Sequence, residues 1–360
     1  MRLNYALALT LLLFFLPIIV LSYPEGSFNT TINQTDPIAW YDLGNELLND
    51  SKYNESIEAY NIAIELNESY VAAWGGKGLA LTKLGNYDKA ILCSDEVIRI
   101  DPKSAEAWRN KGRALYYLDK GEEAVQAYDE AIKIDPEYAD VWYMKGIALG
   151  DQGNYDEAIQ AYDEAIRINP EYTLAWNNKG LDLAKLSNYD EAIQAYDEAI
   201  RINSECTLAW NNKGLAFYYL GNYDEAIQAY DEAIRIDPEY TRAWNNKGLA
   251  FYYLGNYDEA IQAYDEAIRI NPEYALAWNN KGLALAKLSN YDEAIQAYDE
   301  AIRIDPEHAS TWNSKGLAFY YQGNYDEAIQ AYDEAIKIDP GHARAWNNKG
   351  LALADLGVRV

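Results

Sequence analysis

The string NYDEAIQAYDEAI begins at residue 154 and recurs unchanged at residues 188, 222, 256, 290 and 324. Each copy starts 34 residues after the last, and the tryptophans keep the same period from Trp40 to Trp346. A period of this length indicates an array of small units, each covering the apolar face of its neighbour. The 360 residues therefore predict one elongated array instead of two globular domains.

The unit that begins at Thr207 predicts two helices. TLAWNNKGLAFYYLG is expected to form the first, which Gly221 ends. In DEAIQAYDEAIRI the apolar residues fall at i, i+1, i+3, i+4, i+7, i+8 and i+10, which is one face of a second helix that Pro238 ends. Asn222 and Glu225 have the spacing of a capping box at its start. The apolar face of such a helical hairpin must be covered by the next repeat.

This pattern resembles the tetratricopeptide repeat. The residues that carry the resemblance are Trp210, Gly214, Phe217, Ala226, Tyr230, Ala233 and Pro238. The resemblance implies an all-α fold, a right-handed α-solenoid of stacked antiparallel helix pairs, in which the glycine lets two helices approach closely. Nine repeats are expected over residues 37–342 and a half repeat, a first helix only, over residues 343–360. Ser94 and Ser204 depart from the pattern, replacing its tyrosine and its proline.

The residues before the array differ in kind. Arg2 is followed by an apolar stretch over residues 6–21, broken only by Thr10 and Pro17. A membrane-spanning helix needs about 20 apolar residues and a secretory signal roughly 7–15. We expect residues 1–22 to be a signal peptide or an uncleaved N-terminal membrane anchor, followed by a polar linker over 23–36. Either segment would place the array outside the cytoplasm, secreted or membrane-anchored at the cell envelope.

Five sequons lie just behind this segment, and they agree with export. Possible glycosylation sites are Asn29, Asn33, Asn49, Asn54 and Asn67.

Composition and repetition exclude several function classes. The 57 acidic and 30 basic residues give a net charge of −27, which repels phosphate, so no nucleic-acid partner is expected. Near-identical repeats leave no unique catalytic constellation, and we expect no enzyme activity, cofactor or metal. His308 and His342 hold equivalent positions one repeat apart, too distant to share a metal and expected in exposed turns. Cys93 and Cys206 should lie on the order of 30 Å apart as free thiols.

The resemblance also implies where a partner would bind. In this family the first helices line a concave groove, with contacts just after the tryptophan and one or two turns later. Carried onto this chain, the candidate groove residues are Asn177, Asn178, Asn211, Asn212, Asn245, Asn246, Asn279, Asn280, Tyr218, Tyr219, Tyr252, Tyr253, Tyr320 and Tyr321. Amides can pair with a peptide backbone, and tyrosines supply contact area. The alternative is that the asparagines are consensus surface residues and one tyrosine of each pair is core.

Arg109 and Arg113, spaced i, i+4, are expected on the same concave side. They could hold a carboxylate of a ligand or form ion pairs with neighbouring acids.

These observations favour a non-enzymatic scaffold of the cell envelope or exterior that binds a protein or peptide partner in its groove. The alternative is a repetitive architectural spacer with no dedicated ligand. Membrane contact is expected only through residues 6–21, if they are uncleaved. The half repeat WNNKGLALADLG keeps the apolar pattern, which hints at self-association or a continuing array.

Overall fold

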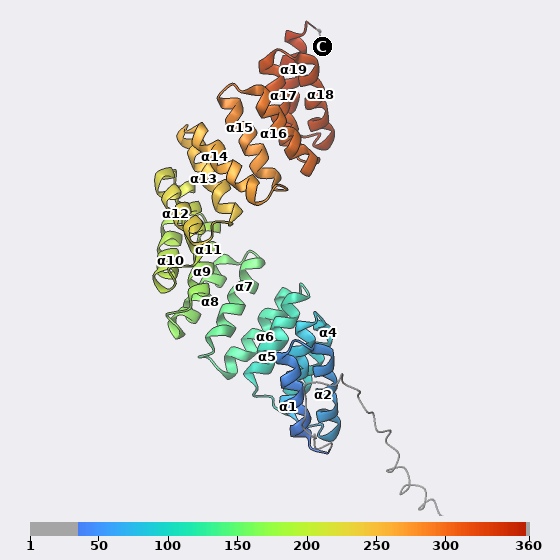
Figure 1. Cartoon of the computed structure of the whole chain (residues 1–360). Helices are drawn as coiled ribbons and strands as arrows, with labels where there is room; N and C mark the ends of the chain where they lie inside the picture. The colour runs from blue at the N-terminus through green and yellow to red at the C-terminus, as the bar shows by residue number, and fades with distance from the viewer. Residues whose placement is uncertain (1–34, 358–360) are drawn as a thin grey trace, which may run out of the picture.

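The computed structural model describes residues 35–357, which form nineteen α-helices and no strand. Figure 1 shows the helices stacked in pairs along an elongated, curved array, with α1 and α19 at opposite ends. The all-α solenoid expected from the repeat is therefore confirmed. The predicted signal or anchor segment, residues 23–34 of the linker, Asn29 and Asn33 lie outside the described residues. Among the described helices, none has both the length and the apolar character needed to span a bilayer.

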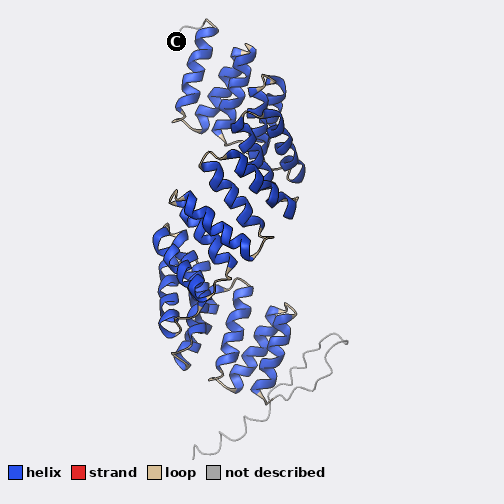
Figure 2. Cartoon of the chain, turned by 90° about the vertical axis from the view of Figure 1, so that its left-hand side faces the viewer, coloured by secondary structure: helices blue, strands red, loops and turns tan. Residues whose placement is uncertain are grey.

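Each repeat contributes an odd-numbered helix followed by an antiparallel even-numbered helix (Figure 2). The odd-numbered helices are α1 (Pro37–Asn49), α3 (Val71–Lys83), α5 (Ala105–Tyr117), α7 (Ala139–Asp151), α9 (Thr173–Lys185), α11 (Thr207–Tyr219), α13 (Thr241–Leu254), α15 (Ala275–Lys287), α17 (Ala309–Gln322) and α19 (Ala343–Asp355). The even-numbered helices are α2 (Tyr53–Leu66), α4 (Tyr87–Ile100), α6 (Gly121–Ile134), α8 (Tyr155–Ile168), α10 (Tyr189–Ile202), α12 (Tyr223–Ile236), α14 (Tyr257–Ile270), α16 (Tyr291–Ile304) and α18 (Tyr325–Ile338).

The two sets of helices form two layers of unequal spacing. Consecutive odd-numbered helices contact one another, whereas consecutive even-numbered helices of the described chain do not. In a curved array the more closely spaced layer lies on the shorter, concave side. The odd-numbered helices therefore line the concave side, which we call the inner face, and the even-numbered helices form the convex outer face.

The two helices of a repeat touch where a glycine faces a buried tyrosine ring. A Cβ atom placed on Gly214 would lie 2.5 to 3.0 Å from ring atoms of Tyr230, closer than van der Waals contact allows. Tyr230 itself is fully buried, so its ring cannot move aside. The close approach expected for this glycine is confirmed, and the same pair recurs from Gly44 with Tyr60 to Gly316 with Tyr332, except in the second repeat, where Ser94 replaces the tyrosine.

The turn between the two helices differs from the sequence prediction. Gly221 has φ 84° and ends α11, as expected. The Asn222 side chain, however, makes no capping hydrogen bond, so the predicted capping box is wrong. Instead the backbone N–H of Asn222 donates to the Phe217 carbonyl at 2.9 Å and that of Gly221 to the Tyr218 carbonyl at 3.0 Å. These bonds form a Schellman turn, which satisfies the last carbonyls of α11 and fixes the entry into α12.

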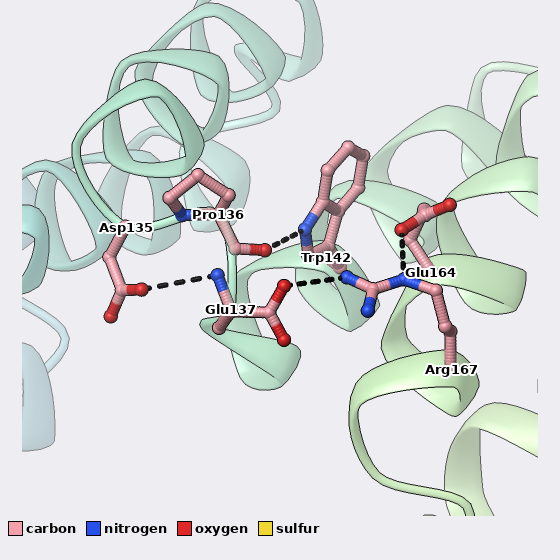
Figure 3. A network of polar contacts seen from close by, with 6 residues as sticks. All are labelled: Asp135, Pro136, Glu137, Trp142, Glu164 and Arg167. Carbon is pink, nitrogen blue, oxygen red and sulfur yellow. Dashed lines mark hydrogen bonds and ion pairs between the residues drawn. The ribbon is translucent and has the colours of Figure 1, made fainter.

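Consecutive repeats are joined by a small polar network, shown for repeats three and four in Figure 3. Trp142 Nε1 donates to the carbonyl of Pro136 at 2.9 Å, which pins the loop before α7. Arg167 then pairs with Glu164 on its own helix at 2.8 Å and reaches Glu137 of that loop at 2.9 Å. The tryptophan bond recurs in later repeats, for example from Trp244 to the Pro238 carbonyl at 3.0 Å.

A lysine of each odd-numbered helix from α5 onward connects to the preceding repeat. Lys213 Nζ lies 2.6 Å from Asp197 Oδ1 of α10 and 5.3 Å from the centre of the Trp210 ring. Equivalent pairs run from Lys111 with Asp95 to Lys349 with Asp333. The aspartate of the second Asp-Glu pair in each consensus repeat is thus used between repeats, which accounts for part of the acidic excess.

The glycine-tyrosine contact predicts opposite effects of one substitution at two equivalent positions. Gly214→Ala should destabilise its repeat by about 1–3 kcal/mol, because the added methyl overlaps a fixed ring. Gly350→Ala, where nothing lies within 4 Å of the added atom, should instead stabilise α19 by up to about 1 kcal/mol through helix propensity. Amide hydrogen exchange of the two helices measures both, and equal effects at the two positions would contradict the steric account.

Candidate partner-binding surface

The asparagines predicted to contact a ligand form a hydrogen-bonded row between repeats. The second asparagine of a repeat donates its amide to the first asparagine of the preceding repeat. The bonds join Asn212 to Asn177 at 3.2 Å, Asn246 to Asn211 at 3.1 Å, and Asn280 to Asn245 at 3.0 Å. At the ends of the row, Asn178 donates to the Tyr143 hydroxyl and Asn279 accepts from Thr311. The amides thus hold neighbouring inner-face helices in register.

Burial excludes most of these amides from ligand contact in this conformation. The first asparagines, with Asn280, are buried: Asn177, Asn211, Asn245, Asn279 and Asn280 are 2–8 % exposed. A buried amide that is already bonded has no free capacity for a peptide backbone. The prediction for these five side chains is corrected to a structural role, whereas ligand contact by the half-buried Asn178, Asn212 and Asn246 stays a prediction.

Each predicted tyrosine pair divides into a packed and an exposed ring. Tyr218, Tyr252 and Tyr320 pack against buried alanines and the core tyrosines of their repeats. Their partners face solvent: Tyr219, Tyr253 and Tyr321 are 62 %, 55 % and 64 % exposed.

The exposed tyrosines join rings of the preceding repeat. Tyr219 stacks on Tyr189 with centroids 5.4 Å apart, and Tyr253 stacks on Tyr223 at 5.7 Å. Ring contacts between 5.4 and 5.7 Å connect seven tyrosines, the tyrosine ribbon: Tyr189, Tyr218, Tyr219, Tyr223, Tyr252, Tyr253 and Tyr257. Ala286 and Lys287 replace the next pair and interrupt it. The ribbon offers continuous ring surface to a ligand of extended shape.

Exposed apolar side chains favour the inner layer. From α6 onward, every large hydrophobic residue that the described structure exposes lies on an odd-numbered helix or its C-terminal cap. Leu174, Leu208 and Leu276, which hold equivalent positions, are 45–49 % exposed, and sequence reasoning did not single them out. The signal that could have found them is a leucine in the first turn of the first helix, where packing does not require one.

The two predicted arginines differ in their contacts. Arg109 Nη1 pairs with Asp140 Oδ2 at 3.0 Å, so the ion-pair alternative is the one that the structure shows for this residue. Arg113 makes no ion pair within the described chain, and its Nε is buried without a hydrogen-bond partner. Burial of an unpaired guanidinium nitrogen is costly, which marks the inner face of α5 as a departure from the consensus repeats.

A cavity of about 300 Å³ lies beside Arg109, between α1, α3, α4 and α5. Two departures from the repeat create it: Ser94 stands where other repeats bury a tyrosine, and Gly75-Gly76 replaces the asparagine pair.

A second cavity of about 270 Å³, the α7–α9 cavity, lies between repeats four and five. Asp182 lines it where neighbouring repeats have alanine, is only 6 % exposed, and leaves Oδ2 without a hydrogen-bond partner. Burial, with the charge of Asp151 added, raises the pKa of Asp182 from 3.8 to about 6, against a lowering by Lys185. Sequence reasoning missed this residue, although an acid in an alanine position of a near-verbatim repeat was a visible signal.

The other predicted features occupy ordinary positions. Cys93 and Cys206 are free, and burial raises the pKa of the Cys93 thiol to about 11, which makes it unreactive. His308 is exposed, as expected, whereas His342 is half-buried and accepts the Ala345 N–H at 3.2 Å.

The remaining predicted surfaces are exposed. The sequon residues Asn49, Asn54 and Asn67 face solvent. In the half repeat, Trp346 and Leu351 are 52 % and 50 % exposed. The described residues contain no group of three or more His, Cys, Asp or Glu side chains arranged to hold a metal ion.

Family models place this chain among repeat proteins. A model described as Tetratricopeptide repeat matches residues 41–105, 93–139, 109–173, 143–205, 177–241 and 245–309, and another of that description matches residues 297–330. A model described as TPR repeat matches residues 316–357. Among proteins with curated descriptions, none matches this sequence significantly.

Several solved structures are similar to this chain over part or most of its length. The chain is similar to the APC/C hetero-tetramer Cut9-Hcn1, with 18% identity, 88% of this chain and 76% of that chain covered, and a TM-score of 0.54. A tetratricopeptide repeat protein from Parabacteroides merdae ATCC 43184 has 17% identity, coverages of 70% and 99%, and a TM-score of 0.55. YrrB, a TPR protein with an unusual peptide-binding site, has 25% identity, coverages of 53% and 99%, and a TM-score of 0.45. The first two share the fold.

The buried acid predicts a pH-dependent effect of Asp182→Ala. Because the folded-state pKa of about 6 exceeds the ordinary 3.8, the charged carboxylate destabilises the fold. That cost is absent below about pH 4, grows through pH 4–6, and is complete above pH 6. The free energy of unfolding of the alanine variant, relative to that of the wild type, should therefore be about 2 kcal/mol greater at pH 7.5 than at pH 4.5. Urea unfolding of both proteins at both pH values measures this, and an equal gain would contradict it.

Proposed function

Because the chain belongs to the tetratricopeptide repeat family, we propose that it is a non-enzymatic scaffold that binds a protein or peptide partner along its inner face. Arrays of this family are generally non-catalytic interaction scaffolds. The observation that carries the proposal is the placement of exposed apolar side chains on the odd-numbered helices from α6 onward. Apolar surface left exposed on one layer of helices favours a partner that covers it.

The spacer alternative has one observation in its favour. Repeats six and seven differ only at Leu208 against Arg242 and at Asp237 against Asn271, and a specific groove usually needs a varied lining. The variation lies in repeats one to five, and residues of these repeats line the two cavities described above. We therefore place the selective polar contacts on α3 to α9, and the apolar contacts on the exposed side chains of α9 to α15 together with the tyrosine ribbon.

We propose further that the array works outside the cytoplasm. The apolar stretch over residues 6–21 behind Arg2, and the five sequons that follow, support export. N-terminal sequencing of the protein from its native cells should find a mature chain that begins near Tyr23, or an intact chain in the membrane fraction. Intact chain that is soluble in the cytoplasm would exclude both forms.

Site-specific photo-crosslinking tests the binding face. A photoreactive residue in place of Leu208 on α11 should give discrete adducts in native cells, because this exposed leucine lies on the inner layer. The matched control replaces Gln228, exposed on α12 of the same repeat, and should give none. Adducts from Gln228 alone would move the partner to the outer face.

A deletion separates the scaffold from the spacer. Removing one whole repeat, Thr241–Tyr274, shortens the array but leaves α3 to α9 intact. The scaffold proposal expects the Leu208 adduct to persist, whereas a spacer depends on length and gives no discrete adduct in either chain.

A further inference from the structure

We propose that the α7–α9 cavity binds the cationic side chain, lysine or arginine, of a partner polypeptide. This inference rests on the proposed scaffold function and names the chemistry of its ligand.

The cavity arises from two departures that fit each other. Gly150 of α7 stands where repeats six and seven have Tyr218 and Tyr252, so the space of an aromatic ring is empty. Asp182 of α9 stands where those repeats have alanine. A Cβ atom on Gly150 would lie 2.7 Å from Asp182 Oδ2, so the acid needs the glycine beside it.

The charges that face the cavity are mainly negative. Asp182 Oδ2 is buried without a partner, and Asp151 adds a second carboxylate at the rim, where it accepts a hydrogen bond from Tyr116. Tyr155 and Tyr162 of α8 also line the cavity. Tyr196 of α10 lies near enough to Asp182 that the carboxylate charge, after burial, raises the pKa of the Tyr196 hydroxyl. An unpaired buried carboxylate is costly, and the alanine of other repeats avoids that cost. A cation in the cavity would remove it.

Among the described residues, Lys185 is the only basic one that lines the cavity; it is exposed at the rim and forms no ion pair with Asp182. A metal ion is disfavoured, because the described residues offer no cluster of three ligating side chains and hard cations need several oxygens. About 270 Å³ accommodates an alkyl-ammonium or alkyl-guanidinium group. A net charge of −27 attracts a basic segment over longer range.

Small probes test the cavity directly on the full chain. Binding of n-butylammonium, which imitates a lysine side chain, is followed through the ¹³C carboxyl resonance of Asp182, with propylguanidinium as the arginine counterpart. We expect saturable binding of at least one cation and at least tenfold weaker binding of n-butanol. Asp182→Asn and Asp182→Ala, followed through the resonance of Asp151, should each weaken cation binding at least tenfold. Alanine occupies this position in other repeats, so that variant should fold.

Two further variants exclude simpler explanations. Lys185→Met should leave the affinity within threefold, whereas a tenfold gain would show that the chain's own lysine fills the cavity and would overturn the proposal. Gly150→Ala in the Asp182→Ala background should fold without strain and bind no cation. Equal affinity for n-butanol, or unchanged cation affinity in Asp182→Asn, would also overturn it.

Photo-crosslinking from Leu181, exposed at the rim of the cavity, then distinguishes this inference from the scaffold function. We expect Asp182→Asn to reduce the adduct at least tenfold. An undiminished adduct would overturn the proposal that the cavity binds a cationic side chain, but it would not contradict the scaffold function. Saturable n-butylammonium binding without any inner-face adduct would instead point to a free amine as ligand and overturn the partner polypeptide.

Discussion

The contact between a backbone and a buried phenol ring determines how each repeat is built. Gly214 has no side chain, so α11 can lie directly on the ring of Tyr230 in α12, and larger residues at that position would separate the helices. The ring is held from the other side by Ala250 of the next repeat. Pairing within a repeat and stacking between repeats therefore depend on the same side chain, which explains why a chain built on it repeats it so faithfully.

Sequence reasoning predicted the features that the period itself specifies. The amphipathic second helix, the glycine that ends the first helix and the close approach at Gly214 all follow from local chemistry that one repeat displays. The prediction of a capping box was wrong because either a side-chain cap or backbone hydrogen bonds to the preceding helix can form at this turn. The backbone N–H of Asn222 bonds to Phe217 of the preceding helix, and the side chain makes no cap.

The binding surface was harder to predict, because it depends on contacts between repeats that a single repeat does not show. An asparagine after the tryptophan has the same appearance whether it faces solvent or a neighbour. Asn246 donates to Asn211 of the preceding repeat, and the recipient is only 3% exposed. The position of the neighbouring repeat decides this, and it depends on packing over the whole interface between the two repeats.

Departures from a near-verbatim repeat are informative because the other copies show what the same position needs for folding alone. Ser94 replaces a tyrosine whose ring is buried in other repeats, and Asp182 places a carboxyl group where other repeats bury an alanine. Each change is unfavourable for packing or solvation, and each lies beside a cavity open to the inner face. Repeats six and seven have neither change, although each buries a tyrosine hydroxyl without a partner, and they contain the asparagine row and most of the tyrosine ribbon. The array thus divides by chemistry: its regular part presents exposed apolar side chains, and its irregular part contains the polar groups that we propose select a ligand.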